Sequence, residues 1–178
     1  MKIAIVAGCN RRNSSSTMMA KFVGERLKSA GHVVNIWDLY DEPLPFYDPD
    51  DETESDTVTR LAQMVAEADA VVLSTPEYHG SVSGVLKNAL DYLGSEHFDG
   101  KMVLCISSAG GSVGVSSLQH MQVIVRNLHG ISCPEWISIG GDQRRFDEQG
   151  EPAHAAVRAR VDRVLMTFVS LAGKMRIT

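Results

Sequence analysis

The chain has 178 residues and a formal net charge of −5, with 44% hydrophobic and 22% charged residues. This balance is typical of a soluble globular protein, and the length fits a single domain over residues 1–178 that needs no disulfides to form a core. The negative charge argues against a general affinity for nucleic acid or for anionic membranes. No apolar run approaches the ~20 residues of a membrane span, so no membrane association is expected.

The cysteines indicate a reducing compartment. There are three, Cys9, Cys105 and Cys133, and they form no C-x-x-C pair. The apolar start, residues 3–7, is shorter than the roughly 7–15 residues of a secretory signal core, so we interpret it as a buried strand. A cytoplasmic protein is expected.

Short apolar runs alternate with amphipathic segments, which is the pattern of a parallel sheet covered by helices. Gly31 is expected to end the first helix, and Pro134 to stand at the entrance of the fifth strand. The acidic segment 41–56 is expected to be a solvated loop, with a partner-docking patch as the alternative. The pattern predicts strands over residues 3–7, 33–37, 70–74, 102–107 and 135–139, and helices over 15–30, 57–67, 84–93, from about 117 to 129, and 153–171.

Right-handed crossovers between these elements give a doubly wound, three-layer α/β sandwich. Five parallel strands fit the order 2-1-3-4-5 of flavodoxin-like proteins, whose ligand crevice lies outside the carboxyl ends of strands 1, 3 and 4. Three loops, residues 8–17, 75–83 and 107–114, are therefore expected to build the site.

The first loop, 8-GCNRRNSSST-17, follows a strand and opens a helix, so backbone N–H groups and the helix dipole favour an anion there. Its arginines and hydroxyls can donate to phosphate oxygens. The alternative is that Ser14 or Ser15 is only a helix N-cap. Neither G-x-x-x-x-G-K-[ST] nor G-x-G-x-x-G occurs, so a monophosphate fits better than a triphosphate or a dinucleotide.

The other two loops suit a flat ring. In 75-TPEYHGSVSG-84, Pro76 and Gly80 shape a turn and Tyr78 offers a planar face, while 107-SSAGGSVG-114 has almost no bulky side chains and permits close backbone approach. The alternatives are that Tyr78 is a packed loop aromatic, that His79 is merely solvated, and that the glycine pair is a flexible connection.

On these residues the sequence resembles the NAD(P)H-dependent FMN reductases, a flavodoxin-like family that includes flavin-dependent azoreductases and quinone or chromate reductases. The resemblance covers at least residues 3–130, and its most specific stretch is 75-TPEYHGSVSGVLKNALDYL-93. The segment 8-GCNRRNSSST-17 is similar to the family's phosphate loop, G-S-x-R-x-x-S-x-x-T. The segment 38-DLYDEPLPFYDPD-50 is similar to its loop after the second strand.

The resemblance implies three groups of FMN-binding residues and a homodimer or homotetramer with FMN near the subunit interface. The phosphate would be held by Arg11, Ser16 and Thr17, with help from Ser14. The isoalloxazine would be lined by Pro76, Glu77, Tyr78, His79, Gly80 and Ser81, and its other edge closed by Ser108, Ala109, Gly110 and Gly111. The chain departs from the family where Cys9 replaces a common serine and where His79 replaces a frequent asparagine.

The expected function is the transfer of hydride from NADPH or NADH, through bound FMN, to a small acceptor such as a quinone, an azo compound, a metal oxyanion or free flavin. No catalytic side chain is expected, because the cofactor carries the chemistry. Cys9 as a reactive thiol is a minor alternative. The histidine and cysteine spacings fit no metal site. The other interpretations are a flavodoxin-type electron carrier, a reductase that releases reduced FMN to a partner enzyme, and a flavodoxin-like domain without flavin.

Overall fold

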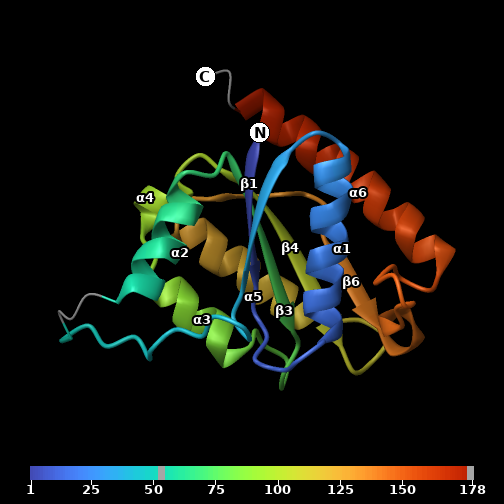
Figure 1. Ribbon diagram of the computed structural model, residues 1–178, viewed down its shortest axis with the longest axis horizontal. Helices are drawn as coiled ribbons and strands as arrows, with labels where there is room; N and C mark the ends of the chain where they lie inside the picture. The colour runs from blue at the N-terminus through green and yellow to red at the C-terminus, as the bar shows by residue number, and fades with distance from the viewer. Residues whose placement is uncertain (52–54, 176–178) are drawn as a thin grey trace.

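The computed structural model describes residues 1–51 and 55–175, so residues 52–54 of the acidic segment and residues 176–178 lie outside the described part. Over the described residues the parallel strands form one sheet in the order β2-β1-β3-β4-β5, with β6 also paired to β4 (Figure 1). The predicted order is therefore confirmed. The strands are β1 (Lys2–Ala7), β2 (Val33–Asp38), β3 (Ala70–Pro76), β4 (Met102–Ala109), β5 (Ile131–Ser132) and β6 (Ile137–Gly140).

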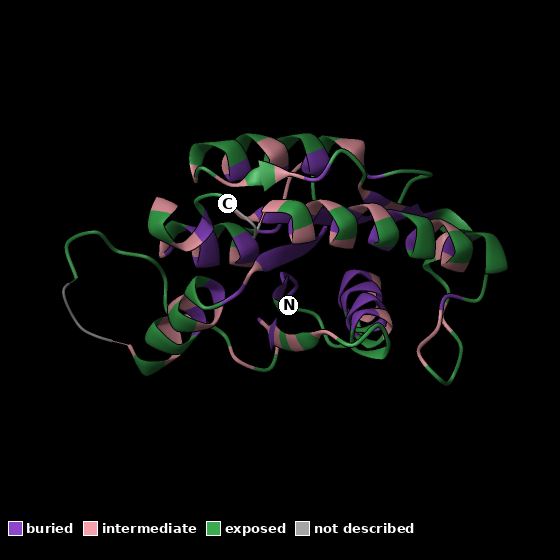
Figure 2. Cartoon of the chain, turned by 90° about the horizontal axis from the view of Figure 1, so that it is seen from above, coloured by how far each residue is buried: buried purple, intermediate pink, exposed green. Residues whose placement is uncertain are grey.

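Helices cover both faces of the sheet and give the expected three layers (Figure 1). One face carries α1 (Ser15–Ser29) and α6 (Ala155–Met175). The other carries α2 (Asp56–Ala66), α3 (Gly84–Asp91), the short α4 (Ser95–Phe98) and α5 (Val115–Asn127). Figure 2 shows buried residues gathered in the sheet and on the inner sides of the helices, with the outer sides exposed.

The apolar strands explain this arrangement. Ile3 and Ile5 pack under α1 and α6, while Ala4 and Val6 pack under the helices of the other face, because successive side chains of a strand point to opposite faces. Every residue of β3 and β4 is buried, as expected for central strands of a parallel sheet. Gly31 ends α1 as predicted, with φ +84° and its N–H bonded to the Lys28 carbonyl.

The predicted fifth strand, residues 135–139, is shifted and divided. Backbone pairing with β4 runs through the Cys133 N–H, which donates to the Val103 carbonyl at 2.8 Å. It resumes only at Ile137. Pro134 has no N–H to continue the ladder, so it separates β5 from β6 rather than opening a strand. A 3₁₀ helix, η1 (Gly141–Arg144), follows β6 and was not predicted from sequence; nor was the short helix α4.

No helix among the described residues has the length and hydropathy needed to cross a bilayer. The carboxyl ends of β1, β3 and β4 lie together at the lower edge of the sheet in Figure 1, and the loops that follow these strands meet there.

Candidate functional site

Hydrogen bonds join the three loops at the carboxyl edge of the sheet. At the end of β1, the Gly8 N–H donates to the Ser74 carbonyl at 2.7 Å, and its carbonyl accepts from Ser83 Oγ at 2.5 Å. The Ser15 and Ser108 hydroxyls are 2.7 Å apart and join the start of α1 to the end of β4, just before the third loop. The Glu77 N–H donates to the Ser108 carbonyl at 2.9 Å and joins the second loop to the end of β4. The sequence elements predicted to form one site are thus brought together.

Gly8 is required by packing. A Cβ at this position would stand 2.6 Å from Leu86 Cβ and 2.7 Å from the Ser74 carbonyl oxygen. Real carbon atoms do not approach this closely, so the first loop can leave β1 alongside α3 only if residue 8 has no side chain. The glycine fixes where the first loop begins relative to the second.

The start of α1 collects hydroxyl groups around its first turn. Ser14 is the N-cap, and its Oγ accepts from the Thr17 N–H at 3.1 Å. The same Oγ lies 3.1 Å from Ser16 Oγ and donates to Thr17 Oγ1 at 2.9 Å, and all three side chains are buried. Ser14 is therefore the N-cap of α1, and its phosphate-binding role stays a prediction. The first turn has no acidic residue, and the amides of Ser15 and Ser16 precede the helical hydrogen bonds, so this end carries positive potential.

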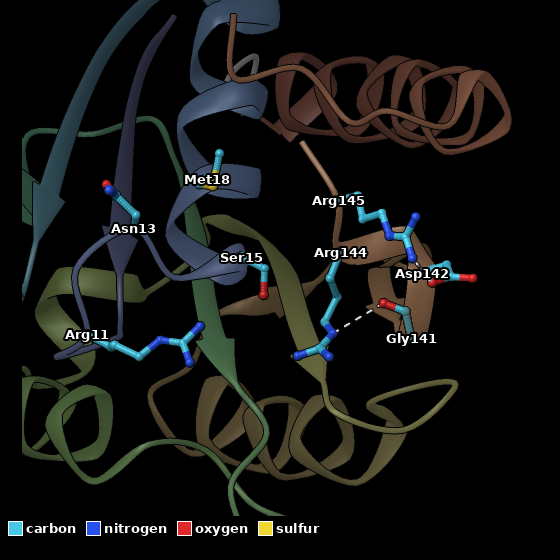
Figure 3. Close-up of a pocket in the computed structure, with 8 residues that line it drawn as sticks. All are labelled: Arg11, Asn13, Ser15, Met18, Gly141, Asp142, Arg144 and Arg145. Atoms are coloured by element: carbon cyan, nitrogen blue, oxygen red, sulfur yellow. Dashed lines mark hydrogen bonds and ion pairs between the residues drawn. The ribbon is translucent and has the colours of Figure 1, made fainter. Parts of the chain in front are cut away.

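The two arginine side chains of the first loop point in different directions and contact different parts of the structure. Arg12 Nε donates to the Tyr40 hydroxyl at 3.0 Å, and its guanidinium lies over the Tyr40 ring at 5.6 Å. Arg11 instead extends into a pocket of about 630 Å³ between the first loop and η1 (Figure 3). Of these two arginines, Arg11 is therefore the one that faces the pocket.

The tip of the second loop is a tight turn. Tyr78 and Ser81 exchange two backbone hydrogen bonds of 3.0 Å, and both central residues have positive φ, +51° at His79 and +73° at Gly80. This sign of φ at both positions is the requirement of a type I′ turn, for which Asn-Gly is the preferred pair. Histidine is among the few residues that tolerate it, which explains how His79 can replace asparagine. The His79 side chain is exposed.

Tyr78, in the second loop, contacts the first loop through Cys9. The residue is 44% exposed, and its hydroxyl is 3.7 Å from the buried Cys9 thiol. Partial burial, followed by the contact with Cys9, raises the pKa of the Tyr78 phenol. Ser81, at the other end of the turn, has its Oγ 2.9 Å from His120 Nδ1 on α5. Tyr78 is thus accessible to a ligand, while its two backbone hydrogen bonds to Ser81 hold its main chain in place.

Glu77 uses its side chain to hold α5. Its Oε2 accepts from both the N–H and the Oγ of Ser117, each at 2.9 Å, and Ser117 Oγ is also 2.7 Å from Ser107 Oγ. The N-cap of α5 is Gly114, which has no side chain to do this. The predicted place of Glu77 at the ring therefore depends on its backbone, because its carboxylate is committed to the helix.

The third loop begins later than predicted, because β4 continues through Ala109 and includes Ser108. Gly110 and Gly111 are exposed, and a Cβ at either would meet no atom within 4 Å. A Cβ on Gly140, in contrast, would collide with the backbone of residues 111 and 112. The end of β6 therefore supports the third loop from behind, and the two open glycines leave its outer backbone accessible.

Comparison with known proteins identifies the family. A sequence model of the family described as NADPH-dependent FMN reductase matches residues 1–144. The chain belongs to this family. It is 36% identical over 155 residues to the FMN-dependent NADPH-azoreductase of Staphylococcus aureus, covering 84% of this chain and 82% of the relative.

Solved structures of flavoenzymes share the fold. FerB, the NAD(P)H:(acceptor) oxidoreductase from Paracoccus denitrificans, superposes with a TM-score of 0.82 at 20% identity, over 98% of each chain. The apo form of the NADH:FMN oxidoreductase EMOB gives a TM-score of 0.77 at 17% identity, over 94% of this chain and 87% of the other. As a member of the FMN reductase family, the chain is an oxidoreductase that uses FMN and NAD(P)H.

The residues present fit FMN. The hydroxyls and amides at the start of α1, with Arg11 beside them, suit the phosphate. The exposed backbone of Gly110 and Gly111 and the half-exposed ring of Tyr78 suit a flat ring. Within residues 1–51 and 55–175, no group of three or more His, Cys, Asp or Glu side chains is placed to hold a metal ion.

Sequence reasoning missed the wall of the pocket that faces the first loop. It is formed by η1, with Gly141, Asp142 and Arg144, and by Arg145 after it. Arg144 is the last residue of the stretch that the family model matches. The consecutive arginines of 143-QRR-145 were the available signal, but the fifth strand was not assigned a site loop because the predicted crevice involved strands 1, 3 and 4.

Proposed function

We propose that the protein passes hydride from NAD(P)H, through FMN held at the carboxyl edge of the sheet, to a small acceptor. The observation that supports this is that hydrogen bonds bring the three loops together. At this junction the hydroxyl groups of the α1 start and Arg11 adjoin the open backbone of Gly110 and Gly111. When bound, FMN would supply the redox chemistry, which is to accept hydride and deliver it to the second substrate.

In this proposal the chain's own residues bind FMN and orient it. Ser14, Ser16 and Thr17 gather at the α1 start, with Arg11 nearby, and would hold the phosphate. The isoalloxazine ring would be contacted by backbone groups of residues 76–81 and 108–111. These two segments lie side by side, because Pro76 pairs with Ser108 where β3 and β4 end. The Tyr78–Ser81 turn is fixed by its two hydrogen bonds, so its amides are oriented before any ligand binds. No side-chain acid or base is required.

The acceptor side of the ring would be open. Gly110 and Gly111 place no side chain over it, and the third loop contains no aromatic residue. This favours an enzyme that admits two substrates in turn over a flavodoxin-type carrier whose ring is covered by aromatics. The similarity to an azoreductase supports azo compounds among the acceptors, beside quinones, metal oxyanions and free flavin.

A homodimer or homotetramer is also proposed. Phe46 is 92% exposed, although the backbone around it is held firmly. The Phe46 carbonyl accepts from the Tyr92 hydroxyl at 3.0 Å, and Asn88 bonds to both the Tyr47 N–H and the Pro45 carbonyl, at 2.8 and 2.7 Å. The adjacent Tyr47 is 45% exposed, and two neighbouring aromatic side chains presented to solvent on a fixed backbone suit contact with a second copy. Light scattering of the eluting protein should give a mass above the 19.4 kDa of one chain, and monomers at micromolar concentration would contradict it.

The activity is tested by following NADPH and NADH oxidation with and without added FMN, with a quinone, an azo dye, chromate or free flavin as acceptor. We expect FMN-dependent oxidation and reduction of at least one acceptor other than flavin. Arg11→Gln should raise the FMN concentration needed for half-maximal rate, while Arg12→Gln, whose wild-type side chain bonds Tyr40, should not. FMN that survives desalting marks a held cofactor, whereas loss of FMN supports the reductase that releases it. No nucleotide oxidation with FMN present would refute the proposal.

A further inference from the structure

The pocket between the first loop and η1 holds more positive charge than the FMN-binding residues predicted from sequence explain. Arg11 enters it from one side and Arg144 from the other, and Figure 3 shows the two guanidinium groups pointing toward one another with Ser15 between them. A third arginine, Arg145, also lines the pocket. Its charge is matched, because Arg145 Nη2 lies 2.9 Å from the Asp142 carboxylate.

Arg11 and Arg144 have no such match. Asp142 is the one carboxylate among the lining residues and is already paired. Arg144 Nε has only the Gly141 carbonyl at 3.4 Å, and in the described part of the chain neither Arg11 nor Arg144 has a carboxylate within ion-pair distance. Two like charges that face each other across a hollow repel, and an anion placed between them removes that repulsion.

The position of Arg144 is set by the fold. Just before η1, Ser138 of β6 accepts from Arg160 Nη2 through its carbonyl at 2.6 Å and from the Gly114 N–H through its Oγ at 3.0 Å. Arg160 also donates to Gln143 Oε1 at 3.0 Å. The backbone that carries Arg144 is therefore tied to α6 and to the third loop, so its place opposite Arg11 belongs to the folded structure.

We propose that Arg11 and Arg144 bind one phosphate group between them, so that η1 supplies a phosphate-binding residue that the first loop alone lacks. Guanidinium groups donate in a planar fork that matches phosphate oxygens. Ser15, whose hydroxyl points into the space between the two arginines in Figure 3, supplies a further donor. The inference rests on the proposed function, which offers two sources of a phosphate monoester: FMN itself, and the phosphate that distinguishes NADPH from NADH.

The test compares Arg144→Gln with Arg163→Gln, which removes the same charge from an exposed position on α6 away from this pocket. Flavin-free full-length protein is titrated with FMN and with riboflavin, which lacks the phosphate, and KM is measured for NADPH and for NADH. A hydrogen bond to a charged group is worth enough to change affinity about tenfold. A loss near this size for FMN but not riboflavin supports the inference and assigns FMN as the source. A rise in KM for NADPH alone supports it and assigns NADPH.

Equal losses for FMN and riboflavin, or an Arg144→Gln variant indistinguishable from Arg163→Gln, would overturn the two-arginine site and leave the proposed function standing. A third arm does not depend on flavin. Inorganic phosphate, at constant ionic strength against chloride, should raise the melting temperature of wild type and Arg163→Gln but not of Arg144→Gln. If the wild type neither binds flavin nor oxidises NADPH, the proposed function fails, and the phosphate arm alone decides the site: no stabilisation of the wild type overturns it.

Discussion

Removing the Glu77 carboxylate should destabilise the protein, because this side chain caps α5 from a loop 40 residues away in sequence. Glu77→Ala deletes two 2.9 Å hydrogen bonds from Ser117, whose N–H is the donor at the third helical position that an N-cap side chain ordinarily satisfies. Ser117 is fully buried, so its amide would be left without an acceptor.

Hydrogen bonds to a charged acceptor contribute about 1.5–3 kcal/mol each, and loss of an N-cap costs about 0.5–2 kcal/mol. Glu77 is only half-buried, so water can replace part of the interaction, and the Ser117 hydroxyl keeps Ser107 as a partner. We therefore expect Glu77→Ala to lower the free energy of unfolding by about 2 kcal/mol, which corresponds to a melting temperature lower by roughly 4–8 °C for a chain of this size. Glu77→Gln keeps an acceptor oxygen and should cost about half as much.

The assay is urea denaturation followed by circular dichroism, with Glu25→Ala as the matched control. Glu25 forms an exposed 2.9 Å pair with Lys28, so its loss should change stability by less than about 0.5 kcal/mol. A double-mutant cycle with Ser117→Ala should show a coupling of about 1 kcal/mol or more. The capping argument is refuted if Glu77→Ala costs no more than Glu25→Ala, and additivity with Ser117→Ala would show that the Ser117 hydroxyl bond to Glu77 contributes nothing.

Three further predictions concern the same region and the core. Gly8→Ala should lower the unfolding midpoint by forcing its Cβ into Leu86 and the Ser74 carbonyl, at a cost of about 1–3 kcal/mol; an unchanged midpoint would contradict the packing argument. His79→Val should cost about 1–2 kcal/mol in the same assay because φ is +51°, while His79→Asn should cost nothing; equal effects would show that the turn does not constrain this residue. Burial raises the pKa of Cys105 from 9.0 to about 12. The thiol therefore ionises in the unfolded chain above pH 9 while it stays neutral in the folded protein, so the free energy of unfolding is unaffected below pH 9 and falls as the pH rises toward 12. The free energy of unfolding of wild type should therefore fall more steeply between pH 9 and 11 than that of Cys105→Ala, and parallel profiles would count against it.

The sheet was predictable because its signals are local. Apolar runs such as those of β3 and β4 are buried on both faces, and alternation with amphipathic helices fixes the parallel order and hence the edge at which the loops meet. The start of α1 was predictable for the same reason, since Ser14 and the hydroxyls after it are short-range helix signals.

What sequence did not predict depends on contacts between distant residues. The break at Pro134 needs the register of β5 and β6 on β4, which apolar content does not give. The commitment of Glu77 to α5 arises because Gly114 offers no cap of its own, a pairing visible only once the second loop lies against that helix. Arg144 faces Arg11 only because the chain after β6 returns to the start of α1. The roles of the individual FMN-binding residues stay predictions.

The central claim is that the junction of the three loops binds FMN in a form that NAD(P)H can reduce. The most direct measurement is the visible spectrum of the purified protein, with FMN added if it is colourless, before and after NADPH or NADH is supplied without oxygen. The account predicts a protein-bound flavin spectrum that bleaches on addition of the nucleotide. A protein that stays colourless and leaves added FMN free, or a bound flavin that neither nucleotide bleaches, would contradict it.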